Sequence, residues 1–128
     1  AQQVGLSPTP CLERVRRLEK NGYITGYVAL VDPDKLNANT VAFIQVSLTS
    51  TSTRNLQNFS EQMQRLEEVE SCHMVAGGFD YLLKVRCADM QHYQHFLGEE
   101  LAAINSVAQT HTYVVIEEVK SETAIPVT

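Results

Sequence analysis

Hydrophobic and polar positions follow two different periods along the middle of the chain. Residues 41–48 alternate one by one, which is the period of a half-buried strand. The inner face of this strand carries Ala42, Ile44, Val46 and Leu48. Residues 54–67 instead repeat every three to four positions, which is the period of an amphipathic helix. The apolar stripe of this helix consists of Leu56, Phe59, Met63 and Leu66.

The same two periods continue through the second half of the chain. Apolar runs at 72–76 and 81–87 predict strands, and Asp89 can cap a helix that follows them. The inner stripe of that helix consists of Tyr93, Phe96, Leu97, Leu101 and Ile104. A last strand is predicted over 109–119. The order β-α-β-β-α-β predicts an α+β fold of the ferredoxin-like type, with two helices on one face of a four-stranded antiparallel sheet.

The second face of this predicted sheet is partly apolar. Val41 and Phe43 lie on it, together with Tyr113 or its neighbours on the last strand. An apolar sheet face rarely stays exposed to water in a soluble protein. We therefore expect a second copy of the chain to cover it, which predicts a homodimer formed through the sheet face.

A separate helix is predicted before this domain. Ser7-Pro8-Thr9-Pro10 offers two pairs of an N-cap and a proline, and Asn21-Gly22 supplies a left-handed stop after about Lys20. The polar side of the helix carries four cations, Arg14, Arg16, Arg17 and Lys20. Residues 1–30 hold four cations and two anions, whereas residues 31–128 hold six cations and thirteen anions. The N-terminal part is thus the part suited to a polyanion, although a solvated basic face gives the same pattern.

The remaining segments connect and end these two parts. The β-prone run Tyr23–Val31 predicts a connecting strand, and a loop follows it to about residue 39. We therefore divide the chain into residues 1–22, a linker at 23–39, the sheet domain at 40–119 and a tail at 120–128. The first residues look like the last turn of a helix, so we expect a preceding segment that this chain lacks.

Composition narrows the classes of function. With 128 residues and 44% hydrophobic content, the chain can bury a real core, and it contains no run long enough for a membrane span and no export leader. Three cysteines without CxxC spacing favour a reduced cytoplasmic setting, while a Cys72–Cys87 bridge stays open. His92 and His95 lack further ligands at zinc spacing, so we predict no metal, cofactor or catalytic group. The charge run Glu67, Glu68 and Glu70 is expected to be solvated.

The stretch Gly77-Gly78-Phe79-Asp80 separates two of the predicted strands. Paired glycines suit a hairpin turn because glycine reaches positive φ without a steric clash. The turn can also hold a small polar ligand, since it places backbone amides and the Asp80 carboxylate at the edge of a sheet. On the residues alone both interpretations stay open, a plain hairpin that Asp80 caps and a ligand site.

Several motifs occur in an order that resembles one family. Val4-Gly5-Leu6-Ser7, followed by Arg14-Val15, Leu18, Gly22, Ile24 and Gly26-Tyr27, is similar to the second half of the helix-turn-helix in the Lrp/AsnC (leucine-responsive, feast/famine) bacterial regulators. His73, Gly77 and Asp80-Tyr81-Leu82-Leu83 resemble the effector-domain turn of that family. Thr110, Thr112-Tyr113-Val114-Val115 and Glu117-Glu118-Val119-Lys120 resemble its last strand. The resemblance covers essentially the whole chain and is nearest to the leucine-responsive branch.

The resemblance implies a transcriptional regulator of amino-acid metabolism that binds double-stranded DNA and is not an enzyme. Its recognition helix would span residues 7–18, and the implied DNA contacts are Ser7, Thr9, Arg14, Arg16, Arg17 and Lys20. A small amino acid such as leucine would bind at contacts between dimers, and dimers would assemble into octamers or other larger species. The implied effector residues are Met74, Gly77, Gly78, Asp80, Tyr81, Met90, Tyr113, Val114 and Val115.

Two departures and two rival hypotheses accompany this prediction. The first part of the helix-turn-helix would lie before Ala1, and relatives often carry an acid where Gly78 stands, which leaves Asp80 as the acid of the turn. The first rival is a free-standing amino-acid sensor without DNA binding, against which the cations of residues 11–20 argue. The second rival is a small ferredoxin-like enzyme with a deep pocket inside each protomer.

Overall fold

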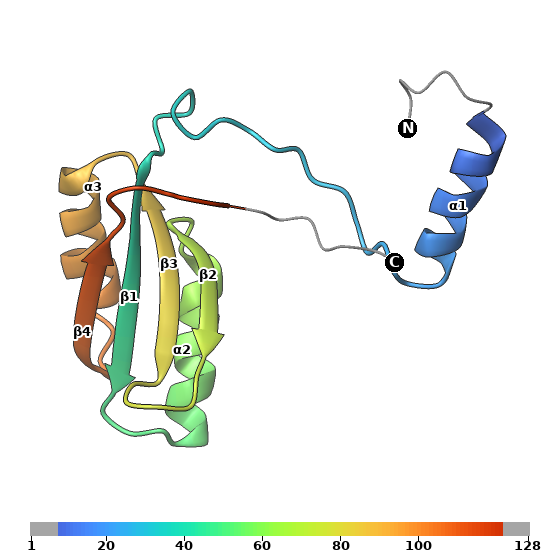
Figure 1. Ribbon diagram of the computed structural model, residues 1–128. Helices are drawn as coiled ribbons and strands as arrows, with labels where there is room; N and C mark the ends of the chain where they lie inside the picture. Colours follow the sequence, from blue (N-terminus) through green and yellow to red (C-terminus); the bar gives the residue numbers. More distant parts are fainter. Residues whose placement is uncertain (1–7, 122–128) are drawn as a thin grey trace. The chain divides into compact units, whose positions relative to one another are not determined.

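The structure is a computed structural model, and it describes residues 8–121. The chain divides into two compact units after Val31. The second unit contains a four-stranded antiparallel sheet, which Figure 1 shows with its strands nearly upright. Among the described residues, every helix is too short or too polar to cross a bilayer.

The sheet has the strand order β2-β3-β1-β4. Its elements follow the chain as β1 (Thr40–Leu48), α2 (Thr53–Arg65), β2 (Val69–Met74), β3 (Tyr81–Cys87), α3 (Met90–His95), a π-helical continuation η1 (Phe96–Leu101) and β4 (Val107–Val114). Each pair of neighbouring strands is antiparallel. This is the predicted ferredoxin-like arrangement, and the prediction is confirmed.

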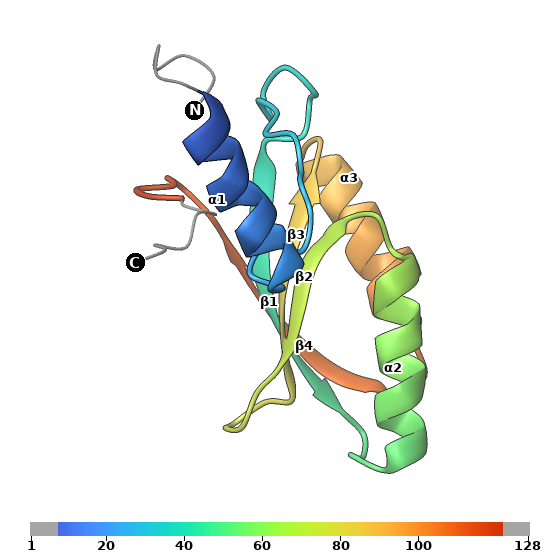
Figure 2. The same ribbon diagram turned by 90° about the vertical axis from the view of Figure 1, so that its right-hand side faces the viewer.

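Both helices of the domain lie on one face of the sheet, as Figure 2 shows edge-on. Alternation along β1 and β3 directs every second side chain towards them, so that β3 buries Tyr81, Leu83, Val85 and Cys87. The helices contribute Phe59 and Met63 from α2 and Tyr93 from α3 to the same core. The predicted cap of α3 is confirmed, because the Asp89 side chain accepts a hydrogen bond from the His92 amide. The start of α2 has a cap that was not predicted, in which the Ser52 side chain accepts from the Asn55 amide.

The second half of the last helix has π geometry instead of ordinary α geometry. The Ala102 amide donates to the Leu97 carbonyl, five residues earlier. The wider turn brings Phe96 and Leu101 onto one face, and both are fully buried. In an ordinary α-helix, residues five apart point in clearly different directions.

Two strands have other limits than the sequence predicts. β2 begins at Val69 and ends at Met74 instead of spanning 72–76, so the loop before β3 has six residues and not four. β4 ends at Val114 instead of reaching 119. The Val115 amide makes a last hydrogen bond to the Val41 carbonyl, and because β1 begins at Thr40, the chain beyond has no strand to pair with.

The first unit consists of α1 (Pro8–Lys20) and the extended segment after it. The helix ends as predicted, with Gly22 at φ +81 and with hydrogen bonds from the Gly22 amide to the Glu19 carbonyl and from the Tyr23 amide to the Leu18 carbonyl. The expected strand at Tyr23–Val31 is wrong for the single chain. A strand needs a neighbouring strand for its backbone groups, and among residues 8–121 no strand lies beside this run; its Ile24 amide bonds to the Leu18 carbonyl at the helix end instead.

Candidate ligand loop and DNA-binding helix

The loop between β2 and β3, residues 75–80, is tied to the sheet by Asp80. The Asp80 amide donates to the Val46 carbonyl at 3.0 Å, and the Asp80 carbonyl accepts from the Val75 amide at 3.0 Å. The Asp80 carboxylate accepts from the Leu48 amide at 2.8 Å through Oδ2. Asp80 therefore fixes the base of the loop, as expected if the loop is only a hairpin turn. The second carboxylate oxygen, Oδ1, can still accept a hydrogen bond from a ligand.

The two glycines of this loop are exposed and do not use the left-handed region. Among the described glycines, positive φ occurs at Gly22 and not at Gly77 or Gly78. A Cβ added at either loop glycine would meet nothing within 4 Å. The expected need for positive φ is therefore wrong, and what the glycines provide is a loop tip whose backbone is open to solvent.

Tyr81 begins β3 directly after this loop, and its side chain points into the protein. Only 2% of its surface is exposed, and its ring lies against the Phe59 ring with centroids 4.4 Å apart. Burial raises the pKa of the Tyr81 phenol. The Tyr81 side chain is thus a core group beside the loop, and it contacts solvent-accessible space through a groove behind β2.

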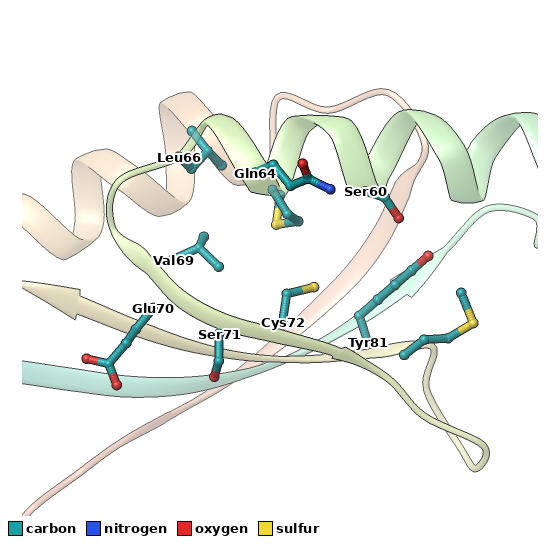
Figure 3. Close-up of a pocket in the computed structure, with 10 residues that line it drawn as sticks. Ser60, Gln64, Leu66, Val69, Glu70, Ser71, Cys72 and Tyr81 are labelled. Carbon is teal, nitrogen blue, oxygen red and sulfur yellow. The ribbon is translucent and has the colours of Figure 1, made fainter. Parts of the chain in front are cut away.

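This groove, which we call the α2–β2 groove, lies between α2 and the edge strand β2 (Figure 3). It encloses about 390 Å³ and is lined by Ser60, Met63, Gln64, Leu66, Val69, Glu70, Ser71, Cys72, Met74 and Tyr81. Met74 and Tyr81 are two of the effector residues that the family resemblance implies. The sequence predicts Met63 and Leu66 as part of the apolar stripe of α2, but it does not predict the groove, because α2 and β2 meet there only after folding.

The implied effector residues do not come together in one protomer. Gly77, Gly78 and Asp80 precede the first residue of β3, whereas Met90 follows its last residue. The seven residues of β3 separate these ends by about 20 Å. Val114 pairs with Ala42, and Ala42 pairs with Val85 near the far end of β3. One free amino acid cannot touch both groups within a single protomer.

A charged network on the outer face of the sheet was not predicted. Arg86 donates through Nε to Glu70 at 2.8 Å and through Nη1 to the Ala38 carbonyl at 3.2 Å. Lys84 lies 2.9 Å from Glu70 and 4.0 Å from Glu118. Partial burial raises the pKa of Glu70, but the hydrogen bonds from Arg86 and Lys84 outweigh it, so that the pKa lies below its ordinary value. Glu70 is therefore paired and not merely solvated, which corrects the prediction.

A second pair holds the start of α3. His92 accepts from the Ala88 amide through Nδ1 at 3.0 Å, so its Nε2 carries the proton and donates to Glu68 at 3.0 Å. Glu68 is also paired, contrary to the expectation of a solvated charge run. Both ring nitrogens of His92 have protein partners, and no group of three potential metal ligands gathers within residues 8–121.

The cysteines are free thiols. Cys72 lies opposite Leu83 in the register of β2 and β3, and Cys87 stands four residues farther along β3, about 13 Å away. A bridge between them is therefore excluded by distance. Burial raises the pKa of Cys72 and also that of Cys87, which reaches about 11.

The cations of α1 are all exposed. Arg14, Arg16, Arg17 and Lys20 leave the half-buried side of the helix to Cys11, Val15 and Leu18. Within the described part of the chain, no carboxylate forms an ion pair with any of the four. Ser7 lies outside the described residues, and Thr9 belongs to the first turn of α1. The described helix thus offers a charged side that is free for phosphates.

Comparison with known proteins gives matches to both units. The family described as the Lrp/AsnC ligand binding domain matches residues 41–125, and the family described as winged helix-turn-helix DNA-binding matches residues 1–25. The leucine-responsive regulatory protein of Escherichia coli K12 is 50% identical over 120 residues, which cover 94% of this chain and 73% of that protein.

Solved structures agree with these matches. A transcriptional regulator of Neisseria meningitidis in complex with L-Met is 34% identical with a TM-score of 0.88, covering 98% of this chain and 80% of its own. A feast or famine regulatory protein from Mycobacterium tuberculosis, complexed with L-methionine, is 30% identical with a TM-score of 0.77, covering 98% and 82%.

Proposed function

Because this chain belongs to the Lrp/AsnC family of amino-acid-responsive, DNA-binding transcriptional regulators, we propose that it binds its effector at a site shared between protomers. The observation that carries this proposal is the separation of the implied effector residues. The loop at 75–80 and the group at Met90, Val114 and Val115 lie at opposite ends of β3. A site that uses both groups needs the loop at 75–80 of one protomer and the residues at the opposite end of β3 in another protomer.

The loop supplies the charged contacts of this proposed site. Asp80 holds the loop through one carboxylate oxygen and keeps the other for the ammonium group of an amino acid. The exposed amides near Gly77 and Gly78 can donate to its carboxylate. Met90 and Val114, which are 45% and 44% exposed in one protomer, supply apolar surface for a side chain. Leucine or methionine, the ligands that the names of relatives indicate, have the matching chemistry.

The proposed DNA contact is α1. Its four exposed cations can pair with phosphates and release counterions, which is the sequence-independent part of DNA affinity. Thr9 belongs to the first turn of the helix, where a recognition helix contacts base edges or phosphates, and we assign the same role to Ser7, which precedes Pro8 in the sequence. The proposal therefore assigns DNA to residues 7–20 and the effector to the sheet domain.

We propose that two protomers meet through the outer face of the sheet. Phe43 and Tyr113 are direct neighbours there in the β1–β4 register and are both exposed in the single chain, at 37% and 56%. A surface of this kind is usually covered by a partner, and a larger assembly of dimers, such as an octamer, would bring loops and far ends together.

Mixing two defective variants tests the shared site. Asp80→Asn damages the loop half, and Met90→Gln damages the far half. Neither pure variant should bind leucine or methionine in a calorimetric titration. After the two proteins are unfolded and refolded together, mixed assemblies should recover part of the binding. Recovery would not occur if each protomer held a complete site, and that result would refute the proposal.

Filter binding tests the DNA assignment and the rival of a free-standing sensor. Replacing Arg14, Arg16 and Arg17 by alanine should weaken binding and lower the slope of log affinity against log salt by about 0.9 for each lost phosphate contact. Arg54→Ala and Arg65→Ala, which remove exposed cations of α2, are the matched controls. A protein without salt-dependent DNA affinity would favour the sensor alternative.

A further inference from the structure

The α2–β2 groove contains a buried hydroxyl without a partner. Among the described residues, the Tyr81 Oη is enclosed and accepts or donates no hydrogen bond. Figure 3 shows it pointing towards Ser60 on α2. The Ser60 hydroxyl lies close enough to oppose the rise in the Tyr81 pKa, but the geometry of a hydrogen bond is not reached. A buried hydroxyl without a partner costs stability, so a bound group that pairs with it is favoured.

The groove combines apolar walls with several polar groups, which together can hold a small molecule that has both kinds of surface. Met63, Leu66, Val69 and Met74 form apolar walls, and α2 contributes the polar side chains of Ser60 and Gln64. Its volume of about 390 Å³ lies within the range of ligand pockets. Met74 stands directly opposite Tyr81 in the β2–β3 register and is largely exposed, so its flexible side chain can move aside to admit a ligand.

The charges around the groove decide the class of ligand. Its lining contains one ionised side chain, Glu70, and that carboxylate is already paired with Lys84 and Arg86. No cation lines the groove, so the carboxylate of a free amino acid would have no partner there. An uncharged molecule avoids this desolvation cost.

Backbone groups of β2 add hydrogen-bonding capacity. β2 is an edge strand, paired with β3 on one side only. Every second residue of such a strand therefore turns its amide and carbonyl away from the sheet. An amide group of a ligand can bind to the Tyr81 hydroxyl and to the β2 backbone together. Its carbonyl accepts from the Tyr81 hydroxyl, and its N–H donates to a free backbone carbonyl of β2.

We propose that the α2–β2 groove is a second ligand site, separate from the loop at 75–80, for a small uncharged molecule that combines an apolar body with an amide. The groove would bind a class of compound that the proposed amino-acid site does not bind, because the amino-acid site recognises an ammonium group and a carboxylate. The amino acid and the uncharged molecule would bind to different residues of the same domain.

The test uses the full chain and N-acetyl-leucinamide as the probe. This compound has the leucine side chain and amides but no charge. In ¹H–¹⁵N NMR spectra it should shift the signals of residues 60–66 and 69–72 with a dissociation constant in the roughly millimolar range. Free leucine at the same concentration should leave these signals unchanged. If the probe shifts no signal of the groove, or shifts only the loop at 75–80, the proposal is wrong.

Two variants locate the hydrogen bond. Tyr81→Phe keeps the ring and its packing against Phe59, and it should weaken binding of the probe roughly threefold to tenfold. Tyr93→Phe removes a buried hydroxyl that is paired with Thr112 outside the groove, and it should leave binding unchanged. Equal affinity of the wild type and Tyr81→Phe would mean that the hydroxyl holds no ligand, and it would overturn the proposal. Because leucine titrations report the loop site separately, a failure here would leave the proposed effector site untouched.

Discussion

The carboxylate of Asp80 accepts a hydrogen bond from the backbone amide of Leu48, 32 residues earlier in the chain, at 2.8 Å. The bond joins the base of the loop at 75–80 to the end of β1, where the Leu48 side chain is buried. An alanine at position 80 therefore changes two properties at once, the fold of the loop and its charge.

Asparagine and alanine at position 80 separate these properties. Asp80→Asn keeps an oxygen that can accept from Leu48, so the free energy of unfolding should change by less than about 1 kcal/mol. Asp80→Ala leaves the Leu48 amide without a partner and should cost about 1–3 kcal/mol. Urea denaturation measures both values. Amino-acid binding should be lost in both variants, since neither supplies a charge for the ammonium group. If asparagine retained full affinity, Asp80 would be structural only.

The rings of Phe59 and Tyr81 pack against each other at an interplanar angle of 34° beside the loop at 75–80. Phe59→Ala removes a fully buried ring whose centroid lies 4.4 Å from that of Tyr81, and should destabilise the domain by about 3–5 kcal/mol in urea denaturation. Gln57→Ala, two residues earlier on the exposed side of α2, is the control and should stay within about 0.5 kcal/mol of the wild type. Equal stability of the two variants would contradict the packing described above.

The pairing of Glu70 predicts a loss of stability in acid. Its pKa is lower in the folded protein than the ordinary value of 4.5, so its stabilising contribution is complete above about pH 4.5. As the pH falls through the folded pKa, Glu70 takes up a proton and that contribution disappears. Denaturation midpoints measured between about pH 6 and pH 3 should therefore fall more steeply for the wild type than for Glu70→Gln.

Glu67→Gln is the control for this acid series. Glu67 is exposed, and it forms no ion pair within residues 8–121. Its removal should leave the slope of the wild type unchanged. A parallel slope for Glu70→Gln and the wild type would show that the network with Arg86 and Lys84 does not stabilise the folded state.

The cysteines should differ in their reactivity. Burial, together with the nearby carboxylates of Glu68 and Asp89, raises the pKa of Cys87 to about 11, so little thiolate is present at pH 8. In a variant that keeps Cys87 as its only cysteine, a disulfide reagent should react no faster than the protein unfolds. A variant that keeps only Cys11, which is half-buried on α1, should react much faster. Similar rates would contradict the burial of Cys87.

The sequence period predicts those features that depend on local burial. Phe59 and Met63 lie where a helical stripe places them, and the alternation of β1 and β3 predicts which side chains face the helices. A helix stop needs only local chemistry, and for that reason Asn21-Gly22 also predicts the end of α1.

Features that depend on a distant partner could not be predicted in this way. β4 ends at Val114 because β1 begins at Thr40, and the run at 23–31 lacks strand structure because no strand of residues 8–121 lies beside it. The pairing of Glu70 with Arg86, and the bond from Leu48 to Asp80, need the register of the sheet. For the candidate site, the family resemblance predicts residues but not that β3 holds them apart.

The π-helical segment also bears on how much the length of this chain can change. Its wide turn contains one residue more than an α-helical turn, and this extra residue lets Phe96 and Leu101 share the buried face. Deleting Gly98, beside which the structure has open space, would convert the segment to an ordinary α-helix with its ends still in register. The last helix is therefore a place where the protein can lose a residue without moving the strand that follows.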